Sequence, residues 1–159
     1  MSWSSRPSRA ALLALLVALA PRTGRAQGWR EMQLHALAIA SRPFFAGAGL
    51  ALGWRDPGRT RWQAAATVGG LDGHGVGARA DLAWHFLLDP AKTRGGGVYG
   101  GAGMSVLAGG GGVTPFVLLV LGVEHAPGSG GGSFMEIGVG GGVRVAVGYR
   151  WRKRNAPGR

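Results

Sequence analysis

Apolar residues alternate with small or polar residues, at a period of two, over long stretches of the chain. In residues 76–88, one set of alternate positions runs through apolar residues from Val76 to Phe86, whereas the other contains Arg79, Asp81 and His85. Successive side chains of a β-strand point to opposite faces, so this alternation predicts strands with two chemically different faces. The pattern predicts eight strands, over residues 31–41, 44–55, 61–69, 76–88, 97–108, 113–124, 134–140 and 143–152.

Two of the predicted strands depart from strict alternation. In residues 31–41, Leu37 and Ile39 interrupt the polar face, and residues 113–124 are apolar on both faces. We expect Phe116, Leu118 and Val120 to face glycine-rich neighbours that leave room for them.

Short segments of turn-forming residues separate the strands. Asp56-Pro57-Gly58-Arg59 is typical, because proline presets φ and glycine accepts a positive φ. Eight strands joined in sequence by tight turns predict an antiparallel, up-and-down meander, and closing it into a barrel removes exposed edges. The expected fold class is therefore all-β.

The composition of the two faces predicts which one lines the interior. One face consists mainly of Gly and Ala with a few charged residues, which suits the narrow interior of an eight-stranded barrel. The other face has no charged residue within the eight predicted ranges. An outward arginine near the middle of a bilayer costs roughly 2–4 kcal/mol, so this face suits lipid. The sequence thus predicts a transmembrane β-barrel.

Aromatic residues of the apolar face gather at one end of their strands. Such residues form a girdle at the membrane interface in transmembrane barrels. The expected girdle consists of Trp54, Trp62, Trp84, Phe86, Tyr149 and Trp151. The alternative is that these residues form the ordinary aromatic core of a soluble barrel. Core aromatics, however, would lie at different heights along the barrel axis.

Charged and polar residues on the inward face are expected to form a network. A buried charge without a partner is very costly, so acids and bases that share an interior should pair. We expect Asp81 near Gln63 across its hairpin, with Arg61 and Arg79 nearby, and Arg144 diagonal to Glu136. The full expected network is Arg61, Gln63, Arg79, Asp81, His85, Glu124, Glu136 and Arg144. Its expected role is structural; a gated ion path and acid–base catalysis are the alternatives.

The first 26 residues resemble a secretory signal peptide. Arg6 and Arg9 precede an apolar run at residues 10–20, and cleavage is expected after Ala26. This run is too short to cross a hydrocarbon core of about 30 Å as a helix, which disfavours a membrane anchor. We therefore expect a signal peptide at residues 1–26, a barrel at residues 27–152 and a basic tail at residues 153–159.

Composition excludes several classes of protein. The 32 glycines are interleaved with apolar residues, unlike those of disordered segments. The absence of cysteine excludes a disulfide-stapled fold. The formal net charge is +11, but the arginines are dispersed, which gives no support for nucleic-acid binding. The one cluster, RWRKR at 150–154, is expected to be a solvated end.

The last predicted strand carries a motif with a polar residue, a small residue and two aromatic residues. Arg144, Ala146, Tyr149 and Trp151 match the spacing polar-x-Gly-x-x-aromatic-x-aromatic, with alanine in place of glycine. On this motif and on its architecture, the sequence resembles the small eight-stranded outer-membrane barrels of the OmpA/OmpX kind. In that family, this motif is the signal that the barrel-insertion machinery reads.

The resemblance implies an outer-membrane location in a Gram-negative-type envelope. It also implies membrane lipid and the barrel-insertion machinery as partners. Two features depart from the family: KRNAPGR follows the last aromatic residue, and the turns away from the girdle are short.

No motif of a catalytic, metal or cofactor site is present. His74 and Asp72 make a weak metal pair, and Ser105 has no histidine or acid at a recognisable spacing. We expect no enzyme activity, no metal and no cofactor. The favoured function is a structural or interaction role in the outer membrane. The alternatives are a lipid-modifying barrel enzyme and a secreted, lipocalin-like barrel that binds an apolar ligand.

Overall fold

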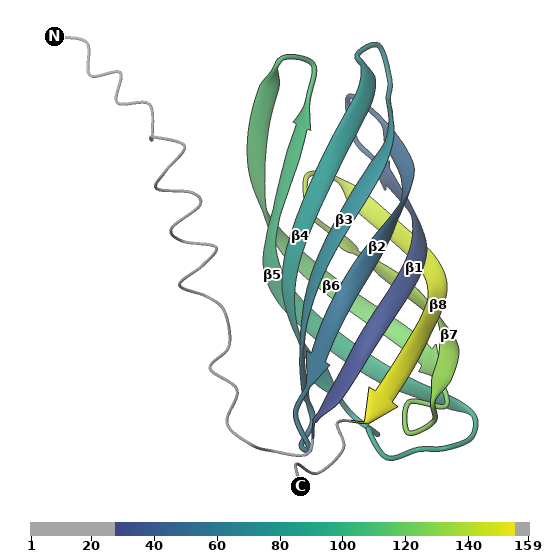
Figure 1. Cartoon of the computed structure of the whole chain (residues 1–159). Helices are drawn as coiled ribbons and strands as arrows, with labels where there is room; N and C mark the ends of the chain where they lie inside the picture. Colours follow the sequence, from purple (N-terminus) through teal and green to yellow (C-terminus); the bar gives the residue numbers. More distant parts are fainter. Residues whose placement is uncertain (1–27, 155–159) are drawn as a thin grey trace, which may run out of the picture.

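The protein is a closed barrel of eight antiparallel strands, seen in a computed structural model that describes residues 28–154 (Figure 1). Each strand pairs with its neighbours in sequence, and β1 pairs with β8 to close the barrel. The strands are β1 (Trp29–Ala40), β2 (Phe45–Arg55), β3 (Thr60–Leu71), β4 (Gly75–Leu87), β5 (Gly96–Gly109), β6 (Gly112–His125), β7 (Gly131–Val139) and β8 (Val143–Arg154).

All eight predicted strands are confirmed, and so is the all-β, up-and-down barrel. The first and last strands are longer than predicted at the end where they meet. Trp29 pairs with Arg154, so β1 begins before residue 31 and β8 continues past residue 152. This pairing places Arg30 and Lys153 within strands. The expected signal peptide, residues 1–26, lies outside the described residues, as do residues 155–159 of the expected tail.

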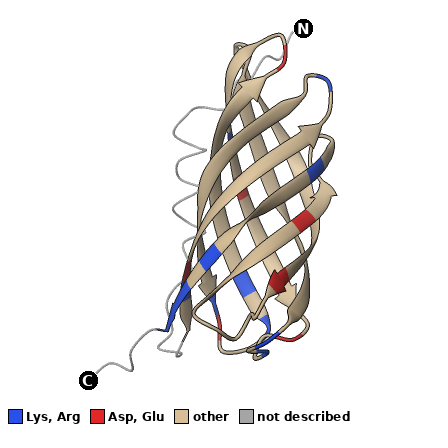
Figure 2. Ribbon diagram, turned by 90° about the vertical axis from the view of Figure 1, so that its right-hand side faces the viewer, with Lys and Arg blue, Asp and Glu red and all other residues tan. Residues whose placement is uncertain are grey.

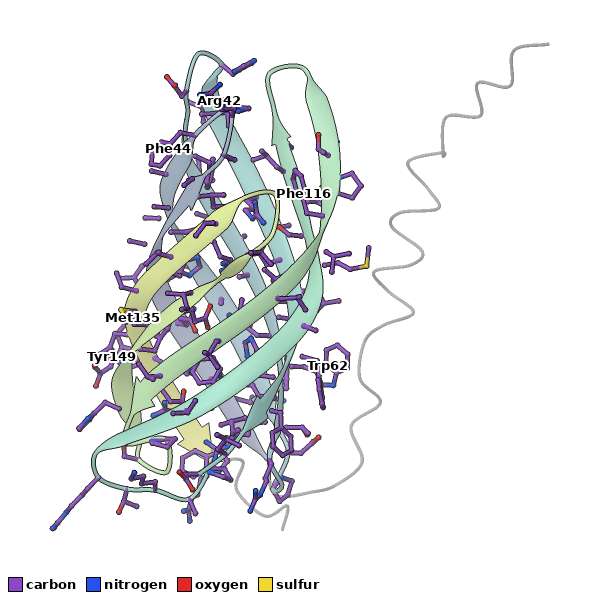
Figure 3. All side chains as sticks on the ribbon, turned by 180° about the vertical axis from the view of Figure 1, so that it is seen from behind. Arg42, Phe44, Trp62, Phe116, Met135 and Tyr149 are labelled. Carbon is purple, nitrogen blue, oxygen red and sulfur yellow. The ribbon has the colours of Figure 1, made fainter. Side chains whose placement is uncertain are left out.

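Apolar side chains cover the outside of the barrel, and charged side chains lie inside. Leu50 is 59% exposed, whereas Arg79 and Asp81 are only 2% and 8% exposed. Burial alternates residue by residue along most of β1, β4 and β8, as the period of two predicts. Phe44, Trp62, Met135 and Tyr149 project away from the wall of the barrel (Figure 3). Residues 28–154 contain no helix that is long and apolar enough to cross a membrane.

A small apolar cluster fills the upper interior, at the end opposite the start of β1 and the end of β8. It explains why Leu37 and Ile39 interrupt the polar face of β1: both are buried against Phe45, Leu71 and Ala146. These residues come from the upper parts of strands that are neighbours around the barrel. Burying this apolar surface shields the upper end of the charged interior from water.

Glycines on neighbouring strands make room for the bulky inward residues of β6. Leu118 pairs with Gly103 of β5, and Val120 lies between Gly101 of β5 and Gly138 of β7. Both side chains are buried. The expected arrangement of large residues opposite glycines is therefore present for these two positions.

The two ends of the barrel differ in their connections. The upper connections are short, and glycines with positive φ occur in the β3–β4 and β5–β6 turns, at Gly73 and Gly110. The longer β4–β5 connection, residues 88–95, lies at the lower end, where β1 begins and β8 ends (Figure 1). It contacts the β6–β7 connection through hydrogen bonds from the amide of Gly128 to Lys92 and from the amide of Ala126 to Gly95. These two connections cover the lower mouth.

Candidate functional site: the charged interior of the barrel

The lower interior contains a dense group of ion pairs, which we call the lower cluster: Glu31, Arg61, Glu124, Arg150 and Arg152. Arg61 Nη1 lies 2.9 Å from Glu124 Oε2 and 3.4 Å from Glu31 Oε2. Arg152 Nη2 donates to the same Glu124 oxygen at 3.1 Å, and Arg150 also binds Glu124. All five residues are buried. One carboxylate from β6 therefore joins arginines of β3 and β8 across the bore.

Nearer the middle of the barrel lies a second group, the upper cluster: Arg79, Asp81, Ser105 and Arg144. Asp81 Oδ1 accepts from Arg79 Nε at 3.0 Å, and Asp81 Oδ2 accepts from Arg144 Nη1 at 3.0 Å. The Ser105 hydroxyl also donates to Asp81. Arg79 Nη2 further donates to the carbonyl of Gly140 at 2.6 Å, in the turn between β7 and β8. This cluster ties β4, β5 and β8 together.

Glu136 of β7 lies between the two clusters. Its Oε2 is 3.7 Å from Arg144 Nη2, and its Oε1 is 3.9 Å from Arg150 Nη2. Oε1 also accepts a 2.7 Å hydrogen bond from the hydroxyl of Tyr99. The charged groups thus form one connected network along the interior.

Aromatic rings pack against the arginines of this network. The guanidinium carbons of Arg61 and Arg150 lie 4.6 Å and 5.6 Å from the centre of the Tyr99 ring, and Arg150 lies 4.7 Å from that of Phe134. Tyr99 is fully buried, and a Cβ added at Gly122 would collide with its ring. Gly122 is therefore required because the adjacent strand places a large ring against it.

The interior is filled by these side chains. Arg61 and Arg150 are each 0% exposed, and the apolar cluster lies above the network. A buried charge is stable when its partners and hydrogen bonds replace the water that it loses. The arrangement can therefore hold the eight strands in register.

The structure brings some predicted partners together and separates others. Arg144 is diagonal to Glu136, as expected, because Gly138 pairs with Arg144. Gln63 is not directly opposite Asp81: the register pairs Asp81 with Ala65 and Gln63 with Ala83, which leaves Gln63 as a diagonal neighbour of Asp81. The reason is the β3–β4 turn, which is formed by Asp72, Gly73 and His74 and begins the pairing at Leu71 and Gly75.

Arg61, Gln63 and His85 belong to the lower part of the interior. Arg61 Nε donates to His85 Nδ1 at 3.2 Å, and Arg61 has ion pairs with Glu31 and Glu124. Gln63 accepts from Arg150 Nη2 at 3.4 Å. The prediction that Arg61 lies near Asp81 is not supported by any contact among the described side chains, because Arg61 binds Glu31 and Glu124 instead.

The prediction of a solvated RWRKR end is wrong for two of its arginines. Arg150 and Arg152 are buried and belong to the lower cluster. The alternation of the last strand already indicated that both arginines point inward, because it puts them on the same face as Arg144. Glu31, on the inward face of β1, and Tyr99 of β5 are further network residues that sequence reasoning did not include.

The residues of the expected aromatic girdle lie on the outer surface toward the lower end. Trp54 of β2 pairs with Trp62 of β3, which in turn pairs with Trp84 of β4. Tyr149 and Trp151 are adjacent on β8, with ring centres 5.0 Å apart. Phe86 pairs with Thr60 at the start of β3. All six rings are partly exposed, between 37% and 45%.

The remaining candidate residues make separate contacts within residues 28–154. No group of three or more His, Cys, Asp or Glu residues there could hold a metal ion. His74 is exposed and its ring binds the carbonyl of Asp72. Ser105 contacts Asp81, whereas the interior histidines contact other residues: His35 binds Thr67 and His85 binds Arg61.

The fold and its interior define a class of protein: a closed eight-stranded barrel with an apolar outer surface and a charged, filled interior. The chain is similar in structure to the N-terminal β-barrel domain of Pseudomonas aeruginosa OprF, with a TM-score of 0.61 and 12% sequence identity. The match covers 80% of this chain and 100% of that one. The sequence matches no protein-family model and no curated protein. The resemblance to the small OmpA-like barrels is thus confirmed for the fold.

Proposed function

We propose that the protein is an integral outer-membrane β-barrel with a structural or interaction role and no catalytic activity. The observation that carries this proposal is the outer surface. Among the described strands, the outward-facing Lys, Arg, Asp and Glu residues are Arg30 and Lys153, and both lie at the lower end. From that level to the upper turns, the outward face is formed by apolar and small residues. In water, so large an exposed apolar surface would cause aggregation.

The dimensions of the strands also support a membrane setting. The strands contain 9 to 14 residues. A tilted strand needs about 9–11 residues to cross the hydrocarbon core. Trp54, Trp62 and Trp84 lie side by side at the lower boundary of the apolar band, where amphipathic rings prefer the interface. Both ends of the described chain lie at this end, which we assign to the periplasmic side.

The lipocalin-like alternative does not fit the interior. A barrel that carries an apolar ligand needs an apolar cavity, whereas this interior contains buried arginines and carboxylates in mutual contact. The apolar surface that could bind a hydrophobic molecule lies on the outside. The lipid-modifying enzyme has no comparable support, because Ser105 lacks a contact with a histidine within residues 28–154.

Membrane fractionation followed by gel electrophoresis of unheated and boiled samples tests the proposal. We expect the full chain in the outer-membrane fraction, and a change in mobility on boiling, because a closed barrel resists detergent until it is heated. Recovery in the soluble periplasmic fraction with no mobility change would contradict the proposal. Incubation of the folded barrel with radiolabelled phospholipid or lipopolysaccharide tests the absence of catalysis, and a time-dependent lipid product would overturn that part.

A further inference from the structure

The lower rim of the outer surface contains two basic residues directly opposite each other. Arg30 of β1 and Lys153 of β8 are a register pair, and both are exposed. Like charges directly opposite on antiparallel strands repel each other. Neither has an ion-pair partner among residues 28–154, since the neighbouring Glu31 points inward to Arg61 and Arg152. The two cations are therefore available to an anion from outside the protein.

The surroundings of the pair indicate which kind of anion fits. A shallow depression contains Arg30 and Lys153 together with Met32, Leu52 and Trp151. Met32 pairs with both Leu52 and Trp151, so these three residues form one outward apolar row just above the two cations. Met32 is 52% exposed and Leu52 is 53% exposed. A ligand at this place meets positive charge below and an apolar wall above.

Trp54 completes the site on the side away from Lys153. It is the register partner of Arg30 on β2 and is partly exposed on the same face. An indole at the interface has an apolar body and one N–H donor, which suits the boundary between a lipid headgroup and its acyl chains. Lys153, Arg30 and Trp54 thus lie in one row across three neighbouring strands.

Basic residues are concentrated at this end of the molecule. Figure 2 shows Lys and Arg gathered near the lower end of the barrel, toward the C-terminus. Many of them belong to the buried network or to the connections across the mouth. Arg30 and Lys153 differ because they are on the outer wall, adjacent to the apolar band. Their position suits a ligand that approaches from within the membrane.

We propose that Arg30 and Lys153 bind the phosphate of an anionic phospholipid in the leaflet at the lower end of the barrel, with its acyl chains along Met32 and Leu52. The inference rests on the proposed membrane location. Guanidinium and ammonium groups donate charge-assisted hydrogen bonds to phosphate oxygens, which are about twice as strong as hydrogen bonds between neutral groups. The bound phosphate also relieves the repulsion between the two cations.

The test measures quenching of tryptophan fluorescence by lipids with brominated acyl chains. The full chain is folded into phosphatidylcholine vesicles that contain a small fraction of brominated phosphatidylglycerol or, separately, of brominated phosphatidylcholine. Trp54 and Trp151 flank the site and report a lipid bound there. We expect the brominated phosphatidylglycerol to quench more strongly at equal mole fraction.

Charge variants distinguish a site from a general attraction. R30Q/K153Q should lose most of the preference for phosphatidylglycerol, because both groups that donate to the phosphate are removed. The matched control, K92Q/R94Q, removes the same charge from the exposed β4–β5 connection at the same end and should retain most of the preference. Equal loss in both variants, or equal quenching by the two lipids in the unmodified protein, would overturn the inference.

Folding controls separate the failure of this inference from the failure of the proposed function. Each variant must show the mobility change on boiling. If the unmodified chain does not insert into vesicles, the membrane proposal fails. If it inserts but shows no preference between the lipids, only the headgroup site fails.

Discussion

Asp81 shows how a single inward residue joins strands that are not neighbours in sequence. It accepts from Arg79 on its own strand, from Ser105 on β5 and from Arg144 on β8. Each partner supplies hydrogen bonds that replace those of water. Removing one partner of such a buried pair leaves the other charge buried without a partner. This loss of stability is larger than that caused by removing both partners.

Replacing Asp81 with asparagine should therefore destabilise the barrel by about 3–5 kcal/mol. The double variant D81N/R144Q should lose clearly less, because one of the two buried arginines is then neutralised. D81N/R59Q is the matched control: it removes the same charges, but Arg59 is exposed in the β2–β3 connection. Urea unfolding in lipid vesicles, followed by tryptophan fluorescence, gives the three free energies. Equal losses of unfolding free energy in the two double variants would contradict an energetic coupling between Asp81 and Arg144.

Glycine has a packing role at positions that face a large inward side chain. A Cβ at Gly122 would overlap the Tyr99 ring, which is fixed by Glu136 and by flanking arginines. We expect G122A to destabilise the barrel by about 1–3 kcal/mol, because the ring has no free space to move into. G70A is the control, since an added Cβ there has no neighbour within 4 Å. The same unfolding measurement should find G70A close to the unmodified protein.

At the level of single strands, the outward face of β2 gives a direct test of the lipid setting. Leu50, at 59% exposed, lies in the middle of the apolar band, whereas Val113, at 65% exposed, lies at the start of β6 beside the upper turn. L50R should destabilise the inserted barrel by roughly 2–4 kcal/mol, since it puts a charge near the middle of the bilayer. V113R should cost clearly less. Similar and small effects of both variants would indicate that water surrounds the barrel.

Strand positions could be predicted because the period of two is a local property of the chain. The alternation in residues 76–88 needs no knowledge of other strands to separate Val76 from Arg79. Strand ends were less accurate where they depend on a partner far away in sequence. The extension of β8 through Arg154 follows from its pairing with the first residues of β1, and this pairing puts Lys153 opposite Arg30.

For the molecule as a whole, the connected network implies a barrel without an open channel. The lower cluster, Glu136 and the upper cluster follow one another along the interior, and the connections at residues 88–95 and 126–130 cover the lower mouth. Arg55 also donates to the carbonyls of Pro90 and Pro127 in these connections. Eight strands enclose an interior that side chains can fill.

We therefore expect the purified barrel to give no steady ion current in a planar lipid bilayer at neutral pH. Buried side chains, among them Arg61, Glu124 and Arg150, occupy the interior through which ions would have to pass. Protein that has been boiled before addition is the control for leakage caused by unfolded chains. Uniform conductance steps from the folded protein, absent from the boiled sample, would show that the network opens a path.

The sequence by itself determined the strands and the two faces of each strand, because period-two alternation and turn residues act over a few neighbouring positions. The sequence also predicted a closed barrel, because closure removes exposed strand edges. It also placed Arg79, Asp81 and Arg144 on the inward face. Only the tertiary structure decided which charges meet. Glu124 of β6 binds Arg61 of β3 and Arg150 of β8 across the bore, and these contacts depend on strand register and on the curvature of the barrel. Neither quantity is encoded in the spacing of residues along one strand.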